Sequence, residues 1–424
     1  MGTILVLLVF NRPELVLYGI PLLSVLVSVL REISINLGQT QFTFSGLLWF
    51  VSAGYAVLYI LVHLKQMRIS SFLWPFVALS VWAFIRWILS PTFIGLKDLF
   101  WYSLPVIFGI FTQLVIENKN FNMFQLVLRI NAVFLYSALI PIMVYTIALT
   151  IGLAEMTWRG PIGTLVGAAR GVPLYLLIVL SLALAEWRYG LLKKRGRFFS
   201  LVSLGIIFFS LARMASILGL FLIPFYKVNP RRKWQIMGSV FLAVILIYTM
   251  VAHIPWLKRR FFFTEDWSFS MKSITTALNT SGRNIIWPIV WASAIQQPLI
   301  GHGLGKARLL VGELFGYQLG FKAYYPHNEY LHVFHDLGMV GLVLVLCAWL
   351  NILLSNWKAW RRGASPLVRR WSMASVLSTG AVLVSSLTDN TLHYPIVIVP
   401  AIIISSVSDV FRQIDIYRLL KGAS

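Results

Sequence analysis

The sequence predicts an all-α integral membrane protein. Of its 424 residues, 58% are hydrophobic and only 12% are charged. The mean hydropathy is +0.80, and this composition lies outside the range of ordinary soluble domains. The apolar residues gather in runs of about twenty, which is long enough for a helix to cross a bilayer. We therefore expect residues 1–424 to form a single polytopic membrane domain.

The apolar runs predict about twelve transmembrane helices. The first run lacks the basic stretch and the small-residue cleavage site of a signal peptide, so we interpret it as the first membrane helix. We assign a pair of short helices to the run at 198–226. The other expected helices cover 8–30, 43–63, 71–90, 99–117, 123–152, 172–190, 235–253, 331–352, 371–389 and 394–411.

Two basic clusters explain the pair at 198–226. KKRGR (Lys193–Arg197) precedes this run and RRK (Arg231–Lys233) follows it. Cytoplasmic loops carry an excess of Lys and Arg. If both clusters are cytoplasmic, the run enters and leaves on the same side, with LARMAS (Leu211–Ser216) at its apex. The same rule places both chain termini in the cytoplasm.

The largest hydrophilic segment, 254–330, falls between the ninth and tenth expected helices and therefore on the outer face. Its basic character favours either a surface that contacts lipid headgroups or a site for an anionic substrate carried by the membrane. The net charge of +22 would suggest nucleic acid in a soluble protein, but here its distribution over the loops matters more. The single cysteine, Cys347, excludes an intramolecular disulfide.

Two arginines occupy positions that indicate a function. At Arg213 a cation within the membrane is costly, and at Arg283 a cation is well placed to bind an anion. Arg213 interrupts an apolar run whose halves, at about 20 Å each, are too short to cross the bilayer. It then either faces a functional cavity or reaches a lipid headgroup. Arg283 follows Ser281, which we expect to cap a helix running toward Pro298. Backbone N–H groups and the guanidinium would converge on an anion there.

Two further elements on the outer side are basic. Arg159 and Arg170 flank the segment GPIGTLVGAA and either bind an anion or belong to a solvated loop. GHGLGK, which ends in Lys306, lacks the first glycine and the final Ser or Thr of a Walker A motif, so a nucleotide site is not expected. A glycine turn that donates N–H groups to an anion remains possible.

The stretch YYPHNEYLHVFHDLGMVG (Tyr324–Gly341) carries three histidines. Helical phase places His327 and His332 about 140° apart, so no metal site is expected. The same phase aligns His327 with Gly338 and Gly341, on a helix whose outer end would present His327. His332 and His335 lie deeper, and we expect them to form structural hydrogen bonds.

His327 is the candidate general base. The unperturbed pKa of histidine, near 6.5, suits accepting a proton from a hydroxyl at neutral pH. Asn328 or Glu329 could orient its ring. The alternative is that Pro326, His327 and Asn328 only cap the helix at a wet interface.

The segment HNEYLHVFHDLGMVG reads as His-Asn, nine residues, Gly, two residues, Gly. It resembles the signature of the O-antigen ligases of lipopolysaccharide assembly, within the wider O-antigen ligase and polymerase membrane family. The upstream segments SGRNIIW and PLIGHGLG are similar to landmarks of that family's outer loop. The specific motifs cover about 212–341, and the resemblance in topology covers the whole chain.

This resemblance implies a twelve-helix inverting glycosyltransferase of the bacterial inner membrane, with 254–330 as a large periplasmic loop. Such an enzyme transfers a glycan from undecaprenyl diphosphate to a sugar hydroxyl of lipid A-core. It needs no nucleotide, metal or other cofactor. An O-antigen polymerase or a protein O-oligosaccharyltransferase of the same family is the alternative. A non-catalytic polysaccharide or lipid transporter is less favoured. Its polar groups should gather near the membrane midplane, whereas the polar candidates here gather at the outer face.

The resemblance also implies roles for single residues. His327 would activate the acceptor and Arg283 would hold the diphosphate. The family's Arg-x3-Leu motif fits Arg170 literally, whereas Arg213 has Ile217 in place of Leu but sits in the expected hairpin, so we favour Arg213. The expected substrate-binding residues are Arg159, Arg170, Asn328, Lys306 and Tyr325.

Overall fold

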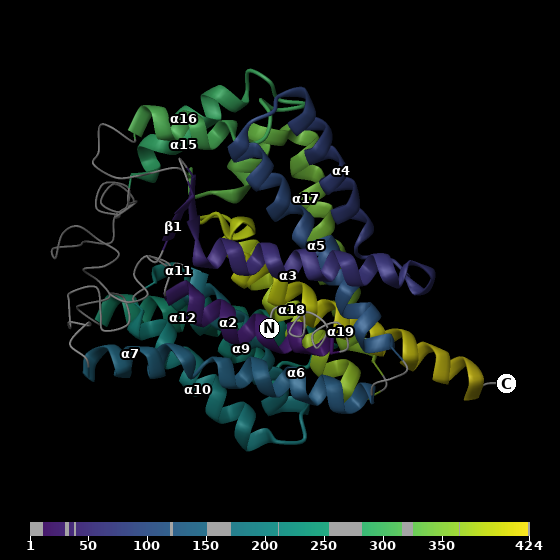
Figure 1. Cartoon of the computed structure of the whole chain (residues 1–424). Helices are drawn as coiled ribbons and strands as arrows, with labels where there is room; N and C mark the ends of the chain where they lie inside the picture. The colour runs from purple at the N-terminus through teal and green to yellow at the C-terminus, as the bar shows by residue number, and fades with distance from the viewer. Residues whose placement is uncertain are drawn as a thin grey trace.

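The computed structural model describes residues 12–29, 34–37, 40–118, 122–150, 171–210, 212–253, 282–315, 325–363 and 365–422. In this part of the chain the protein is helical except for one antiparallel hairpin, β1 (Ser34–Leu37) and β2 (Thr40–Thr43) (Figure 1). The helices are α2 (Glu14–Val29), α3 (Phe44–Val62), α4 (Trp74–Leu89), α5 (Phe93–Glu117), α6 (Met123–Ser137), α7 (Ile140–Thr150), α9 (Gly171–Tyr189), α10 (Lys193–Phe209), α11 (Arg213–Leu222), α12 (Lys233–His253), α15 (Arg283–Ala294), α16 (Lys306–Phe315), α17 (Glu329–Arg362), α18 (Pro366–Ser385) and α19 (Pro395–Gly422). Three 3₁₀ turns join them, η1 (Leu64–Gln66), η2 (Ile223–Lys227) and η3 (Thr391–His393).

This is a multi-pass membrane protein. Within the described residues, 6 helical stretches are long and apolar enough to cross a bilayer: 45–62, 93–117, 123–147, 171–189, 329–362 and 395–415. Apolar stretches of α2, α4 and α12 are shorter. The count of twelve spans and the outer position of 254–330 stay predictions. The expected helix at 123–152 is divided into α6 and α7 by a turn at Ala138 and Leu139.

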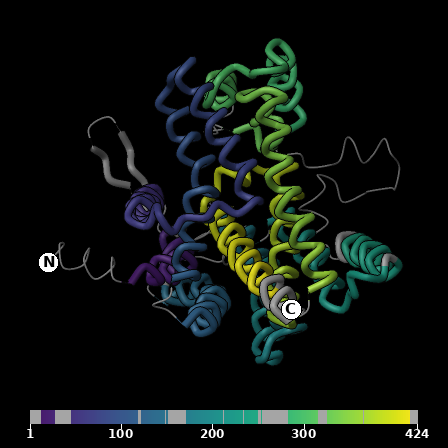
Figure 2. The backbone as a smooth tube through the Cα atoms, turned by 90° about the vertical axis from the view of Figure 1, so that its right-hand side faces the viewer, coloured from purple at the N-terminus to yellow at the C-terminus, as the bar shows by residue number. Residues whose placement is uncertain are grey.

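Two helices form the centre of the bundle. In α9 and in the apolar part of α19, 89% of the residues are buried, because both are apolar all round and suit an interior position. Helices α2, α6, α10, α18 and α19 surround α9. By contrast, α3 and α12 expose many apolar side chains and lie at the edge of the bundle (Figure 2).

The run at 198–226 consists of two short helices, as predicted. α10 and α11 pack against each other and against α9, and the chain turns between them at Ser210. Arg213 is the first residue of α11. Which side of the membrane this turn faces stays a prediction.

Candidate active site

The start of α17 differs from the sequence expectation. Asn328 is its N-cap, and its side-chain oxygen accepts the N–H of Leu331 at 3.0 Å. His327 therefore precedes the helix, with a φ of 54° in the left-handed region that non-glycine residues rarely adopt. Gly338 interrupts the helix with a φ of 68°. The predicted alignment of His327 with Gly338 and Gly341 on one continuous helical face is thus wrong.

The kink at Gly338 results from a close approach by the chain that follows α15. The N–H of Met339 donates to the carbonyl of Pro298 at 2.8 Å. A Cβ at Gly338 would lie 2.3 Å from the carbonyl oxygen of Leu299. A glycine is therefore required by the packing of this turn on α17.

A carboxylate from the α18–α19 connection faces the ring of His327. Nδ1 of His327 lies 3.5 Å from Oδ1 of Asp389. That carboxylate also accepts the backbone N–H of Asn390 at 2.9 Å and the hydroxyl of Tyr394 at 3.0 Å. A carboxylate so held can fix the orientation and tautomer of an imidazole. Sequence reasoning had assigned that task to Asn328 or Glu329 and had missed Asp389.

Glu329 instead pairs with a buried histidine. Its carboxylate lies 3.2 Å from Nδ1 of His393 and accepts the N–H of Leu392 at 3.1 Å. Nε2 of His393 faces Asp98 of α5 at 3.4 Å, and Asp98 also binds Arg308 at 2.8 Å. Burial lowers the pKa of His393, but the carboxylates of Glu329 and Asp98 outweigh it and raise that pKa to about 9.

Asn390 connects His327 to this buried network. Its side-chain oxygen accepts the backbone N–H of His327 at 2.8 Å, and its amide nitrogen lies 3.1 Å from Nδ1 of His332. Nε2 of His332 lies 3.4 Å from Asp336. His332 and His335 are buried and hydrogen-bonded, which supports the structural role expected for both. The left-handed backbone at His327 is thus held by its hydrogen bond to Asn390, which in turn binds the buried His332.

The glycine turn of GHGLGK does bind an anion, but that anion belongs to the protein. The carboxylate of Asp336 accepts the N–H groups of Gly305 and Ala307, each at 2.7 Å. Gly305 has a φ of 81°. Lys306 lies between these two donors as the first residue of α16. These two N–H groups are therefore engaged by Asp336, and the turn serves to anchor α17.

One buried group has the spacing of metal ligands. Ligand atoms of Asp98, His332 and His393 lie within 4.8 Å of one another. The N–H of His327 can only donate, so the oxygen of Asn390 faces it and the amide nitrogen donates to Nδ1 of His332. Nδ1 of His332 thus accepts a hydrogen bond and Nε2 faces the carboxylate of Asp336 at 3.4 Å, so both nitrogens already face groups of the protein. Hydrogen bonding thus favours an ion-pair network, and the expectation of no metal stays a prediction.

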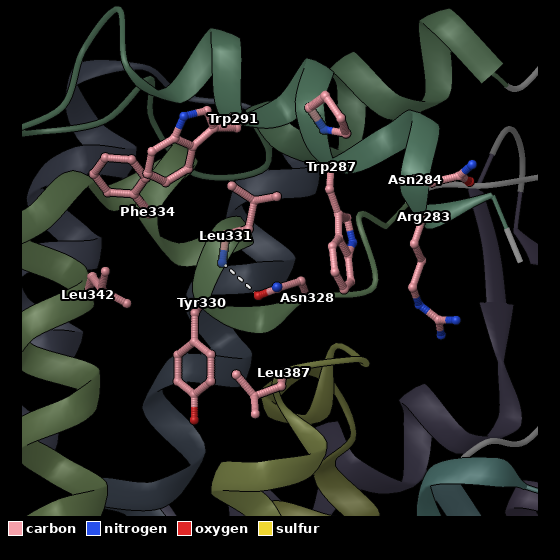
Figure 3. A pocket seen from close by; sticks show the side chains of 11 residues that line it. Arg283, Asn284, Trp287, Trp291, Asn328, Tyr330, Leu331, Phe334, Leu342 and Leu387 are labelled. Atoms are coloured by element: carbon pink, nitrogen blue, oxygen red, sulfur yellow. Dashed lines mark hydrogen bonds between the residues drawn. The ribbon is translucent and has the colours of Figure 1, made fainter. Parts of the chain in front are cut away.

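A cavity of about 580 Å³ adjoins this segment. Arg283 and Asn284 lie at one side, while Trp291, Phe334 and Leu342 lie at the other (Figure 3). The guanidinium of Arg283 donates to the carbonyl of Thr388, next to Asp389, at 2.9 Å. Asn328, next to His327, also lines the cavity. The cavity thus combines a cation with an apolar wall and lies beside the His327–Asp389 pair.

Arg283 begins α15, although the residue before this helix is Gly282, in a left-handed conformation with a φ of 82°. Gly282 occupies the N-cap position, and Ser281, the predicted cap, lies outside the described residues. The indole N–H of Trp287, one turn later, donates to the carbonyl of Pro326 at 2.8 Å. This bond ties α15 to the residue before His327.

The remaining candidates are placed as follows. The ring of Tyr325 lies 5.4 Å from that of His393 and 4.4 Å below the guanidinium of Arg308. Arg213 is partly buried at the start of α11. It is not among the side chains that line the cavity in the described part of the chain. Arg159 and Arg170 lie outside the described residues.

Comparison with known proteins finds similarity over part of the chain. Residues 198–346 match the family described as O-antigen ligase. The match covers less than half of the chain. It runs from α10 into α17 and so contains Arg213, Arg283 and His327. Asp389, Asn390 and His393 lie beyond the match, although they complete the surroundings of His327.

A shorter similarity links the chain to a protein of Rickettsia conorii that carries the provisional name polysaccharide ligase. The two are 31% identical over 90 residues. The match covers 20% of this chain and 22% of that relative. Both comparisons therefore report similarity over part of the chain only.

Proposed function

We propose that this protein is an inverting glycosyltransferase of the O-antigen ligase type. It transfers a glycan from undecaprenyl diphosphate to a sugar hydroxyl of lipid A-core, on the periplasmic face of the bacterial inner membrane. The observation that carries the proposal is the His327–Asp389 pair, whose Nδ1 and Oδ1 are 3.5 Å apart, beside an apolar cavity with Arg283 at one side. The match to O-antigen ligases supports it.

His327 is the base in this mechanism. With Nδ1–H directed at Asp389, Nε2 carries the lone pair that accepts the proton of the acceptor hydroxyl. The hydroxyl oxygen forms a bond to the anomeric carbon of the glycan. The bond from that carbon to the diphosphate oxygen breaks on the opposite face, which inverts the anomeric centre. Asp389 stabilises the imidazolium that results.

The arginines stabilise the leaving group. Undecaprenyl diphosphate gains negative charge as the glycosidic bond breaks, and a fixed cation in a cavity of low dielectric stabilises that charge far better than water does. Arg283 performs this role from α15, and Arg213 supplies a second cation from α11. Asn328, Lys306 and Tyr325, together with Arg159 and Arg170, complete the proposed binding set for the two lipid substrates.

The test is transfer by the purified protein in lipid nanodiscs, with an undecaprenyl-diphosphate glycan and lipid A-core. His327→Ala should lower kcat by about 10²- to 10⁴-fold, the usual contribution of a general base. His253→Ala, which removes an exposed histidine at the end of α12, should leave kcat unchanged. Near-normal transfer by the His327 variant would contradict the proposal. Transfer to a peptide, or to a second lipid-linked glycan, in place of lipid A-core would identify an oligosaccharyltransferase or a polymerase.

The membrane orientation has a separate test. In a Cys347→Ser background, a cysteine at exposed Gln296, after α15, should react with an impermeant thiol reagent from the periplasm. A cysteine at exposed Arg232, before α12, should react only from the cytoplasm. The opposite labelling would contradict the periplasmic placement of His327 and the cytoplasmic placement of both termini.

A further inference from the structure

A second apolar groove lies between α11, α17 and α18. It encloses about 340 Å³, and the described residues that line it carry no charge. Helix α11 and the turn η2 contribute Leu218, Phe221, Leu222 and Phe225, whose spacing places them on one helical face. Trp357 of α17 and Gly380 of α18 line the same space. The groove is therefore shaped for an apolar chain.

The groove and the cavity beside Arg283 are lined by successive parts of the same two segments of the chain. On α18 and the residues after it, Val384 lines the groove and Leu387, three positions later, lines the cavity. On α17, Leu342 lines the cavity and Leu353 lines the groove. These two leucines are eleven residues apart, which corresponds to about 16 Å along the helix and nearly the same face.

On α17, apolar side chains lie between the cavity and the groove. Leu346 and Leu350 lie between Leu342 and Leu353 on α17, one half-buried and the other exposed. Together the cavity and the groove offer a cation at one end and an uncharged apolar path beyond it. This arrangement complements an amphiphile with an anionic head and one long apolar chain.

We propose that the groove binds the distal part of the isoprenoid chain of the lipid-diphosphate donor. The chain runs from the diphosphate at Arg283, along α17, into the space between α11 and α18. The inference rests on the proposed function and extends it to specificity. Donors with short chains fill only the cavity near Arg283, whereas full-length donors also fill the groove.

Gly380 offers a direct way to close the groove. A Cβ at this position would meet no atom within 4 Å, so a larger side chain fits without disturbing α18. Gly238 of α12 is equally open, but it lies outside the groove. Gly380→Trp and Gly238→Trp are therefore a matched pair, and neither residue belongs to the proposed catalytic machinery.

Kinetics with full-length and farnesyl-length donors test the proposal. Gly380→Trp should raise KM for the full-length donor at least tenfold, while KM for the farnesyl-length donor and for the acceptor change less than twofold. Gly238→Trp should change none of them. A rise in acceptor KM alone would assign the groove to the acyl chains of the acceptor and overturn the proposal. Equal behaviour of the two variants would also overturn it.

Photocrosslinking separates this inference from the proposed function. A full-length polyprenyl diphosphate with a diazirine at the end of its chain should label peptides that contain Phe221 or Trp357, and Gly380→Trp should abolish that labelling. The experiment needs no turnover, so a protein inactive toward lipid A-core still gives an answer. Labelling spread over the lipid-facing surface, unchanged by Gly380→Trp, would rule the groove out as the site of the chain.

Discussion

Two clusters of buried charge lie at opposite ends of α18, and one of them lies next to the cavity beside Arg283. The Glu186 cluster joins Glu186 to Arg370 at 2.9 Å, to Arg195 at 3.7 Å and to Asn131 at 3.1 Å. The His393 cluster, beyond the other end of α18, comprises Asp98, Arg308, Glu329, His332, Asp336 and His393. In each cluster every member except one arginine, Arg195 or Arg308, is almost fully buried, so burial of charge does not distinguish them.

Their composition does distinguish them. The Glu186 cluster holds one carboxylate between two arginines and contains no histidine among the residues described here. It connects α6, α9, α10 and α18. The His393 cluster contains two histidines, and Asn390 links it to His327. Buried ion pairs are therefore weak evidence for function by themselves. A titratable network beside a cavity is stronger evidence.

The largest effect on catalysis in this comparison should come from Asp389. Asp389→Asn keeps the shape of the side chain but removes the charge 3.5 Å from Nδ1 of His327. The imidazolium then forms less readily, and we expect kcat to fall by about 10²- to 10⁴-fold with little change in donor KM. Asp409→Asn, which changes a buried carboxylate in the middle of α19, is the control. Comparable kcat losses in the two variants would refute a specific role for Asp389.

The Glu186 cluster should respond in stability rather than in rate. Glu186→Ala leaves Arg370 and Arg195 without their buried carboxylate, a loss that typically costs about 3–5 kcal/mol. Thermal unfolding in detergent should show a large drop in the midpoint temperature. The kcat per folded molecule should stay unchanged. A selective rise in donor KM would instead connect this cluster to substrate binding.

The sequence predicts the helices well because their signal is local. Apolar runs mark where α3, α9 and α12 lie, and the flanking basic clusters were enough to divide 198–226 into α10 and α11. The kink at Gly338 was not foreseen, because it depends on contact with Pro298 and Leu299 from a different element. The helical period predicts which residues share a face only where the helix is unbroken.

The site was predicted in part for the same reason. The motif around His327 is contiguous, but its partner Asn390 lies 63 residues further along the chain. The segment SLTDNTLHYP was a usable signal, since Asp389, Asn390 and His393 form a polar island between two apolar helices. No rule of spacing says that this connection folds against the start of α17. Only packing brings the two together.

Asn390 tests whether the His393 cluster supports catalysis. Asn390→Ala removes the acceptor of the His327 N–H and the donor to His332. Leaving buried polar groups unpaired costs about 1–3 kcal/mol, and His327 loses the bond that holds its left-handed backbone. We expect kcat to fall roughly tenfold, in proportion to that cost, with donor KM nearly unchanged. Asn356→Ala, which removes a buried amide in the C-terminal half of α17, should destabilise the fold without this selective loss.

The smallest expected effect is a pH dependence of stability carried by His393. Its pKa is raised to about 9 in the folded protein by Glu329 and Asp98, above the ordinary value near 6.5. The folded state therefore retains a proton that the unfolded chain has lost. The stabilisation is fully present below about pH 6.5 and disappears as the pH rises through about 9.

Over that window the free energy of unfolding should fall by about 1 kcal/mol per pH unit. Thermal unfolding between pH 6.5 and 9.5 measures this, with His393→Gln as the variant that should remove the slope. Glu186→Ala, which removes the carboxylate of the other cluster and leaves His393 in place, should lower stability yet keep the slope. A slope that survives in His393→Gln would mean that the proton resides on another group. The two clusters would then differ only in their location along α18 and not in their response to pH.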